Sequence, residues 1–296
     1  MTNIPFTKMV GTGNDFVVMD VRRRPLASLK RRWQAVSRFV CDRHWGVGAD
    51  GLLVLERSRA ADARMRVFNP DGSEAGMCGN GARCAALYLG GAKSRRVSIE
   101  TKAGLLSADV RGSRVAMRMT DPRDLTFDLT VEADGRRFRL GFVDTGVPHA
   151  VVPVKALDAV EVGRLGRILR YHSAFAPRGA NVNFIEPANG RVNRLRVRTY
   201  ERGVEDETLA CGTGVVASAI IYTLARDHEP ARPKAGSNGR RSRYRVDVET
   251  VSGDVLVVSF QAVPSGGSAR QVTEVVLEGG ASRAFDGAVA WPPGRA

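Results

Sequence analysis

Two cysteines in matching surroundings are the residues of this chain best suited to chemistry. Cys78 opens the motif Cys-Gly-Asn-Gly, and Cys211 opens Cys-Gly-Thr-Gly. A β-patterned run precedes each motif and an apolar helical run follows it, so each thiol is predicted to lie at a helix N-terminus. The free backbone N–H groups there favour a thiolate, which can act as a base near neutral pH.

Two such thiols suit proton transfer at a single carbon. When they face each other across a substrate, one thiolate removes a proton from one side and the opposite thiol delivers a proton to the other side. This exchange inverts the carbon, so the reaction class is racemisation or epimerisation. Amides at the helix starts would stabilise the enolate-like charge on a substrate carboxylate, and we therefore expect no cofactor and no metal.

Other chemistry has less support from the residues. A cysteine hydrolase needs a histidine beside one thiol, and the 4 histidines leave this alternative open, although it gives the second cysteine no role. Cys41 and Cys84 are expected to be core thiols. The sequence contains no glycine-rich dinucleotide fingerprint, no P-loop and no cluster with metal-ligand spacing.

An internal repeat explains why the two motifs match. Thr12-Gly13 recurs as Thr145-Gly146, at the same separation of 133 residues that relates the two cysteines. Further along, Glu100-Thr101 recurs as Glu249-Thr250 at a separation of 149, so 16 extra residues lie between the motifs of the second copy. They fall in a stretch rich in Gly, Ser, Pro and Arg, which predicts an exposed insertion at about 227–243.

The repeat predicts the fold. We expect two pseudo-symmetric homologous domains of the α/β (α+β) class, each a mixed, mostly antiparallel sheet wrapped around helices, with the active site in the cleft between them. The first domain should span 1–122, with 279–296 packing back on it, and the second should span 123–278. A helix capped by Ser28, with Leu29 on its apolar face, is expected before the first buried strand.

Composition limits the class of protein. Of the 296 residues, 43% are hydrophobic and 26% are charged, and no apolar run is long enough to span a membrane. The N-terminus lacks the pattern of a secretory signal, so we expect a cytoplasmic protein without a membrane partner. The net charge of +14 leaves a basic nucleic-acid-binding protein as a remote alternative. Because the basic residues are scattered and form no reading motif, we expect no nucleic-acid partner.

Six segments, spread over almost the whole chain, stand in the order of a known family. They are FTKMVGTGNDFVVMD, DRHWGVGADGLLVLE, FNPDGSEAGMCGNGARC, TGVPHAV, RGANVNF and YERGVEDETLACGTG. Through them the chain resembles the diaminopimelate epimerase family. The resemblance implies two pseudo-symmetric domains, a homodimer, and interconversion of LL- and meso-diaminopimelate in lysine and peptidoglycan precursor synthesis. Cys78 and Cys211 are the implied acid and base.

The resemblance also implies which residues bind the substrate. Glu201 and Arg202 suit the zwitterionic far end, the carboxylate for its ammonium group and the guanidinium for its carboxylate. His149 resembles a histidine beside the catalytic cysteines that tunes the acidity of a thiol, with a purely structural imidazole as the alternative. The other implied contacts are amides, from the side chains of Asn14, Asn69 and Asn181 and from the helix starts at Gly79, Asn80, Gly212 and Thr213.

Two departures from the family pattern concern the substrate. Val147 precedes Pro148-His149 where many relatives have asparagine, which removes one amide contact, and Gly51 stands where some relatives have glutamine. The alternative on the same fold is a racemase or epimerase for proline, hydroxyproline or histidine. Asn80 and the segment ERGVEDETLACG argue against the proline branch, which typically differs at both places.

Overall fold

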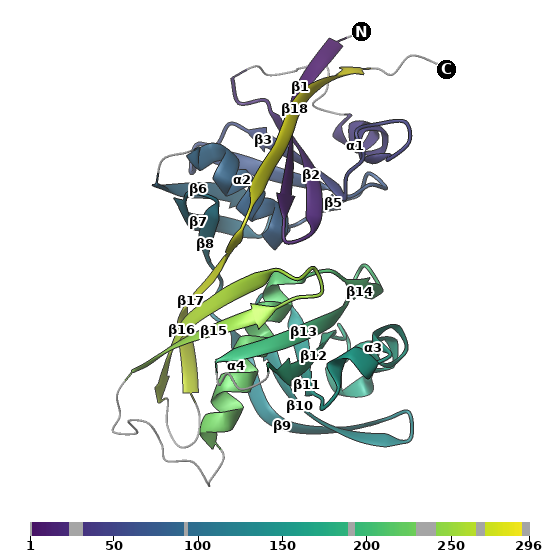
Figure 1. Cartoon of the computed structure of the whole chain (residues 1–296), viewed down its shortest axis with the longest axis vertical. Helices are drawn as coiled ribbons and strands as arrows, with labels where there is room; N and C mark the ends of the chain where they lie inside the picture. Colours follow the sequence, from purple (N-terminus) through teal and green to yellow (C-terminus); the bar gives the residue numbers. More distant parts are fainter. Residues whose placement is uncertain are drawn as a thin grey trace. The chain divides into compact units, whose positions relative to one another are not determined.

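Two units divide the chain in the computed structural model (Figure 1). The structure describes residues 2–23, 32–91, 94–188, 193–228, 241–264 and 270–291. Unit 1 comprises residues 1–117 and 279–296, and unit 2 comprises residues 118–278. The boundary that the sequence suggests, at residue 122, lies a few residues beyond the first segment of unit 1. Among the residues described, no helix combines the length and the apolar character that crossing a membrane requires.

Unit 1 combines strands with two helices. Its elements, in chain order, are β1 (Thr2–Gly11), β2 (Asn14–Asp20), α1 (Trp33–Cys41), β3 (Gly51–Glu56), β4 (Ala63–Phe68), β5 (Glu74–Ala75), α2 (Gly79–Gly90), β6 (Arg95–Thr101), β7 (Gly104–Arg111), β8 (Arg114–Arg118) and, at the end of the chain, β18 (Ser282–Trp291).

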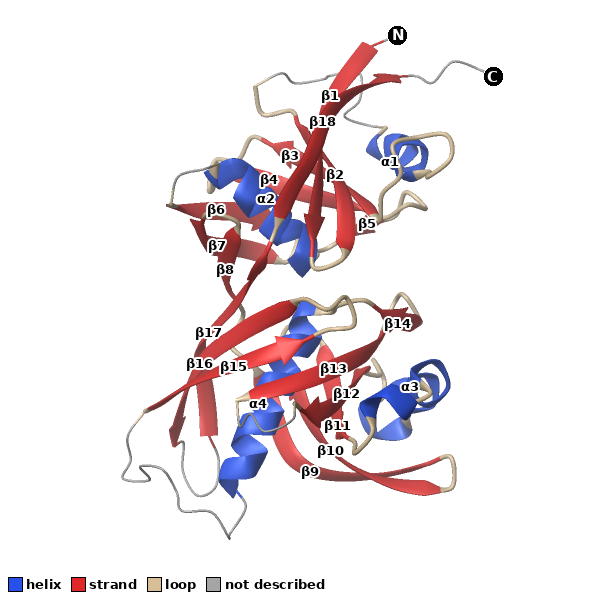
Figure 2. Ribbon diagram, viewed as in Figure 1, coloured by secondary structure: helices blue, strands red, loops and turns tan. Residues whose placement is uncertain are grey.

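Unit 2 likewise combines many strands with a few helices (Figure 2). Its elements are β9 (Arg123–Ala133), β10 (Arg136–Asp144), β11 (Pro148–Pro153), α3 (Val162–Arg170), β12 (Asn181–Pro187), β13 (Arg194–Glu201), β14 (Asp206–Thr208), α4 (Gly212–His228), β15 (Ser242–Glu249), β16 (Val255–Pro264) and β17 (Arg270–Gly280), with short 3-10 turns at Leu157–Ala159 and Ser173–Phe175.

The two units repeat one pattern of strand pairing. In unit 1, β1 pairs antiparallel with β2, β2 parallel with β3, and β3 antiparallel with β4. In unit 2, β10, β11, β12 and β13 pair in the same way. One further strand extends each arrangement, since β18 pairs antiparallel with β1 and β9 pairs antiparallel with β10. The last strand of the chain thus takes in unit 1 the place that β9 takes in unit 2.

One helix in each unit is buried because most of its residues are small or apolar, and Asn80 and Arg83 are buried polar exceptions in α2. Val216, Ile220 and Leu224 of α4 are fully buried, as are Ala82 and Ala85 of α2. Strands of the same unit contact each of these helices on several sides. The result is the mixed α+β arrangement, with strands wrapped around helices, that the repeat predicts.

Some of the expected features fall on residues that the structure does not describe, and two of the observed strands are not expected from the sequence. Ser28 and Leu29 lie outside the described residues, and so does 229–240, the central part of the expected insertion. The helix that follows Ser28 and Leu29 begins at Trp33 and buries Val36 and Val40. Strands β9 and β18 are not among the strands expected from the sequence, although apolar and polar residues alternate regularly along β9.

Candidate active site

Cys78 is the N-cap residue of α2. Its backbone is extended, with φ −138° and ψ 119°, and its Sγ accepts a hydrogen bond from the backbone N–H of Gly81 at 3.4 Å. The first turn closes as Ala82 N–H donates to the Cys78 carbonyl at 2.8 Å. Glycine lets this turn approach β3, because a Cβ at position 81 would lie 2.9 Å from Leu53 Cδ2. The half-buried thiol therefore faces the positive end of a helix, as expected.

The two other cysteines of unit 1 have different surroundings. Cys41 and Cys84 are buried, and burial raises the pKa of both thiols, that of Cys84 to about 12. A thiol held protonated in this way is a poor base and a poor nucleophile. Both residues are core thiols, as the sequence predicts, and none of the four cysteines forms a disulfide.

A chain of side-chain amides connects the start of α2 to the turn between β1 and β2. Asn80 Nδ2 donates to Asn14 Oδ1 at 2.6 Å, and Asn14 Nδ2 donates to Asp50 Oδ2 at 3.0 Å. At the other end, the guanidinium of Arg83 donates to Asn80 Oδ1 at 2.7 Å and to the hydroxyl of Thr12. Asn80 and Arg83 are buried. The structure therefore brings two of the implied substrate residues, Asn14 and Asn80, into direct contact.

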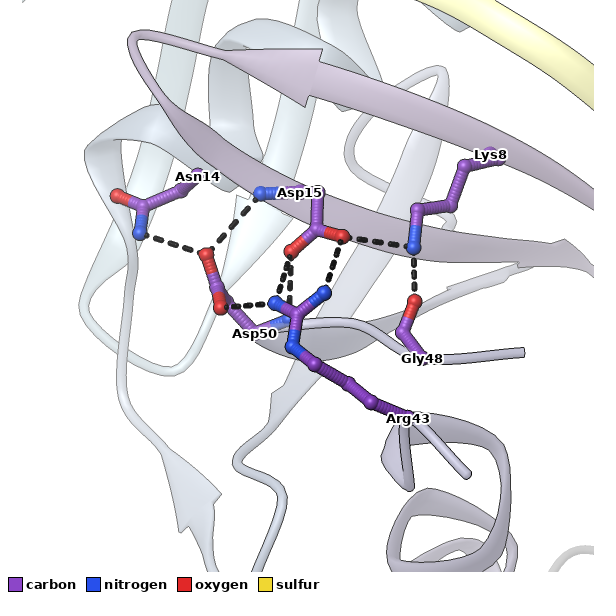
Figure 3. Close-up of polar contacts among 6 residues, drawn as sticks. All are labelled: Lys8, Asn14, Asp15, Arg43, Gly48 and Asp50. Carbon is purple, nitrogen blue, oxygen red and sulfur yellow. Dashed lines mark hydrogen bonds and ion pairs between the residues drawn. The ribbon is translucent and has the colours of Figure 1, made fainter. Parts of the chain in front are cut away.

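Figure 3 shows the charged groups at the outer end of this chain. Arg43 donates to Asp50 Oδ1 at 2.8 Å and to both oxygens of Asp15, and Lys8 lies 2.8 Å from Asp15 Oδ2 and also donates to the Gly48 carbonyl. Burial raises the pKa of Asp15, but hydrogen bonds from Arg43 and Lys8 outweigh it and lower the pKa to about 2. Asp15 thus remains ionised and holds the two cations in place.

Cys211 immediately precedes α4 and is 7% exposed. Its carbonyl accepts from Val215 N–H at 2.9 Å, and its Sγ lies 3.5 Å from Thr213 Oγ1 in a hydrogen bond. The helix start packs tightly on β12, because a Cβ on Gly214 would lie 2.3 Å from Asn183 Oδ1. Gly212 and Thr213 form the first turn of α4, just as Gly79 and Asn80 form that of α2.

Glu201, the last residue of β13, lies against the second thiol. Its carboxyl group is hydrogen-bonded to Cys211 and accepts from Thr208 Oγ1 at 2.9 Å. Burial raises the pKa of Glu201 above its ordinary value, and the two hydrogen bonds compensate only in part. A carboxyl group with a raised pKa can exchange a proton with a neighbouring thiol. The resemblance assigns Glu201 to the ammonium group at the far end of the substrate, and in the structure its carboxyl group also contacts Cys211.

His149 is completely buried on β11. Its Nδ1 accepts from Asn183 Nδ2 at 3.1 Å, so the neutral ring carries its hydrogen on Nε2, which has no partner among the described residues. Burial lowers the pKa of His149 to about 3, and the attraction of Asp144 for the charged form offsets this only in part. The imidazole is therefore a neutral N–H donor at ordinary pH.

Asn181 and Arg202 are joined through the backbone. Asn181 Nδ2 donates to the Pro148 carbonyl at 3.0 Å, and its Oδ1 accepts from the backbone N–H of Arg202 at 2.8 Å. The half-buried guanidinium of Arg202 reaches the Arg178 carbonyl at 3.4 Å. Asn181 therefore orients the segment that carries both Glu201 and Arg202.

Asn69 is the implied substrate residue with the most exposed side chain. It lies in the loop between β4 and β5, where its Nδ2 donates to Ser73 Oγ at 2.9 Å and its backbone N–H donates to the Ser73 carbonyl. Both hydrogen bonds close the turn.

Gly51, where some relatives have glutamine, is closely packed, because a Cβ there would lie 3.2 Å from the Phe68 carbonyl oxygen.

Four polar residues of this region escape sequence reasoning. Asp50, Arg83, Asn183 and Thr208 each make side-chain hydrogen bonds to a residue that the sequence singles out. A usable signal exists for two of them. Asp50 is an acidic residue directly before a buried strand, and Arg83 is a charged residue inside an apolar helix.

Comparison with known proteins identifies the family. The family model described as diaminopimelate epimerase matches residues 6–124 and 141–264. The chain belongs to the diaminopimelate epimerase family. Curated diaminopimelate epimerases include one from Aquifex aeolicus, 41% identical over 292 residues (95% of this chain and 96% of the relative), and one from Archaeoglobus fulgidus, 40% identical over 300 residues (96% and 95%). Diaminopimelate epimerases are isomerases, so the chain is an enzyme of that class.

Solved structures share the fold with this epimerase. A probable proline racemase from Agrobacterium radiobacter superposes with a TM-score of 0.66 at 19% identity, over 98% of this chain and 94% of its own. A hydroxyproline epimerase from Agrobacterium vitis gives 0.66 at 17% identity, over 98% and 93%. At these identities the likeness concerns the fold, a mixed α+β architecture of two pseudo-repeat domains, and it confirms the fold class expected from the sequence.

Proposed function

We propose that this epimerase interconverts LL- and meso-2,6-diaminopimelate by proton transfer between Cys78, Cys211 and the α-carbon. The observation that carries the proposal is the repetition of one arrangement. In each unit a cysteine that forms no disulfide directly precedes a buried helix, after the same succession of strands. The substrate is inferred from the family, since the curated relatives carry the name diaminopimelate epimerase.

The proposed reaction is a two-base exchange. One thiolate removes the α-hydrogen as a proton, and the other thiol delivers its proton to the opposite face of the carbon, so the two sulfurs exchange their protonation states. The amides at the starts of α2 and α4 hold the carboxylate next to the reacting carbon and stabilise the negative charge that develops on it. The steps balance without a cofactor or a metal.

Different neighbouring groups are proposed to favour the thiolate forms of the cysteines. Glu201, whose pKa is raised by burial, accepts the proton of Cys211 when this cysteine acts as the base. His149 presents a neutral Nε2–H, which would favour a nearby thiolate without placing a positive charge in the site. Arg202 is the proposed partner of the distal carboxylate, with Asn14, Asn69 and Asn181 as the further amide contacts.

We also propose, on family resemblance, that the enzyme works as a cytoplasmic homodimer on this small-molecule substrate and serves lysine and peptidoglycan precursor synthesis. Size-exclusion chromatography with light scattering tests the dimer directly. A monomeric mass at micromolar concentration would exclude a stable dimer.

The test of the reaction is isotope exchange. Purified protein and LL-diaminopimelate in deuterated water, with no cofactor added, should yield the meso isomer with one deuterium at the inverted α-carbon, detected by chiral chromatography and mass spectrometry. Cys78→Ala and Cys211→Ala should each abolish epimerisation, whereas the matched control Cys41→Ala should retain it. Substantial epimerisation by either of the first two variants would refute the two-base assignment.

An amino-acid panel tests the alternative substrates. Proline and hydroxyproline are included because proteins named for these substrates share the fold, and histidine because it is the third candidate from the sequence. We expect turnover of diaminopimelate alone. Faster inversion of one of the other amino acids would keep the chemistry and replace the substrate.

A further inference from the structure

Hydrogen bonds run in a single direction from Arg83 to Asp50. The guanidinium of Arg83 donates to Asn80 Oδ1, Asn80 Nδ2 donates to Asn14 Oδ1, and Asn14 Nδ2 donates to Asp50 Oδ2. The ends have opposite and fixed polarity, since a guanidinium can only donate and a carboxylate can only accept. Neither asparagine amide can therefore turn over without placing two donors or two acceptors against each other.

The outer end of this chain is held by charge. Arg43 donates to Asp50 Oδ1 at 2.8 Å, and the backbone N–H of Asp15 donates to Asp50 Oδ2 at 3.2 Å (Figure 3). These groups and Asn14 Nδ2 are all donors, so an amide in place of the Asp50 carboxylate would face donors on both sides. The inner end is buried, as Arg83 is fully and Asn80 almost fully enclosed. Aligned hydrogen bonds in such an environment strengthen one another.

The chain of hydrogen bonds belongs to the first copy of the repeat alone. At the positions 133 residues later, Val147, Thr213 and Val216 stand in place of Asn14, Asn80 and Arg83. Their side chains cannot form the same series of bonds. The start of α4 is instead tied by Thr145 Oγ1, which donates to the Thr213 carbonyl at 3.1 Å. The helix that carries Cys78 is thus anchored by a chain of side-chain hydrogen bonds that the helix of Cys211 lacks.

We propose that Asp50, held by Arg43, is a positioning residue that sets the direction of this hydrogen-bond chain and thereby fixes the first turn of α2, on which Cys78 sits. Asn80 is the second residue of that helix, two residues after the thiol. Fixing its side chain fixes the backbone of the turn, and with it the Gly81 N–H that donates to the Cys78 sulfur. For the two-base reaction proposed above, Asp50 would act on the rate through the placement of Cys78, without contact to the substrate.

The proposal is tested by exchanging donor and acceptor at one link. In Asn14→Asp, two carboxylates face each other at positions 14 and 50, and in Asp50→Asn, an amide faces donors on both sides. In the double variant N14D/D50N, the amide at position 50 donates to the new carboxylate at position 14 and still accepts from Arg43. The chemical groups and the net charge are those of the original pair, with the polarity of the link reversed.

Hydrogen exchange of the first turn of α2 is the main measurement. In each single variant, the amides of Gly81 and Ala82 should exchange about tenfold faster, the factor expected when a buried hydrogen bond is lost. The double variant should return to within about threefold of the original protein, because only the bond from the Asp15 N–H remains lost. Asp109→Asn, which breaks an exposed pair with Arg96, is the matched control and should leave this turn unchanged.

Two further readouts separate this proposal from the proposed function. Alkylation of Cys78 by iodoacetamide, quantified by peptide mass spectrometry, should be altered severalfold in the single variants and restored in the double. For epimerisation, Asp50→Asn should lower kcat about tenfold through the placement of Cys78, and any change of KM would arise through Asn14, the proposed substrate contact that Asp50 also holds. If the double variant exchanges as fast as the worse single variant, or if the single variants match the original protein, the proposal is wrong. Exchange and alkylation decide this even if no epimerase activity is found.

Discussion

A single methyl group at Gly214 tests how tightly the start of α4 is packed. Helix propensity alone favours Gly214→Ala, since alanine is about 1 kcal/mol better than glycine inside a helix. The added Cβ, however, would lie 2.3 Å from Asn183 Oδ1 and 3.4 Å from Cys211 Cβ. The first of these distances is far inside van der Waals contact. Either the Asn183 amide or the first turn of α4 must therefore move.

The free-energy cost of Gly214→Ala depends on the hydrogen bonds that the Asn183 side chain makes. Its Oδ1 accepts from Thr199 Oγ1 at 3.0 Å, and its Nδ2 donates to His149 Nδ1 at 3.1 Å and to the Ala150 carbonyl at 3.2 Å. Overpacking costs about 1–3 kcal/mol, and a buried polar group that loses its partner costs about the same again. After the gain in propensity is subtracted, Gly214→Ala should destabilise unit 2 by roughly 3 kcal/mol.

A control substitution and two spectroscopic probes, one of which follows unit 1 alone, make the assay specific for unit 2. A Cβ on Gly163 of α3 would meet no atom within 4 Å, so Gly163→Ala should be neutral or stabilising by up to about 1 kcal/mol. Trp33, Trp45 and Trp291 all lie in unit 1, so tryptophan fluorescence follows that unit while far-ultraviolet circular dichroism follows both. In urea, Gly214→Ala should lower the dichroism midpoint. A midpoint no lower than that of Gly163→Ala would refute the reasoning.

Three further outcomes are expected. The pKa of Asp15 is about 2 in the folded state against an ordinary 3.8, so the carboxylate stabilises the fold above about pH 4 and loses this contribution as the pH falls towards 2. Asp15→Asn should therefore cost about 2 kcal/mol at pH 7 and far less near pH 2, and equal losses in urea melts at both pH values would contradict this. The pKa of His149 is about 3, so ¹⁵N spectra should show one neutral, Nε2-protonated ring from pH 5 to 8, and a midpoint near 6.5 would be inconsistent. Burial raises the pKa of Cys84 to about 12, so iodoacetamide at pH 8 should modify Cys78 and spare Cys84 in the native protein, and equal labelling would show that the helix opens.

Local signals are enough to predict the arrangement of each cysteine. The glycines after Cys78 and Cys211, with the apolar runs that follow, indicate two buried helices, and the structure begins them at Gly79 and Gly212. Repetition within one chain makes the fold class predictable as well, since two copies of one unit imply two similar domains.

The strands β9 and β18 are not among the elements expected from the sequence, for different reasons. In β9 the apolar residues Leu125, Phe127, Leu129, Val131 and Ala133 alternate with polar ones, which is the period of a half-buried strand, so the sequence does carry a local signal for it. In β18 the side chains are largely exposed until the strand ends at the buried Trp291. Strand β9 also packs its apolar face into the core of unit 2, whereas β18 is ordered mainly by backbone pairing with β1, which leaves little trace in local composition.

The hydrogen bonds between polar side chains of the site also cannot be predicted from the sequence. Asn183 meets His149 because β11 and β12 run parallel in a particular register, with His149 opposite Asn181. Asp50 meets Asn14 because β2 and β3 are paired in the equivalent way. Such contacts depend on the register of strands that are separated by more than thirty residues.

The place of β18 has a consequence for how the protein is made. The ribosome synthesises β1 first and β18 almost last, yet the two pair along nearly their whole length. At about 5–20 residues per second, roughly 15–60 s pass before the partner of β1 exists. During that time one edge of β1 is open to pairing with other chains, whereas β10 of unit 2 pairs with β9, the strand directly before it in the chain. Unit 1 therefore lacks this strand until the whole of unit 2 has been synthesised.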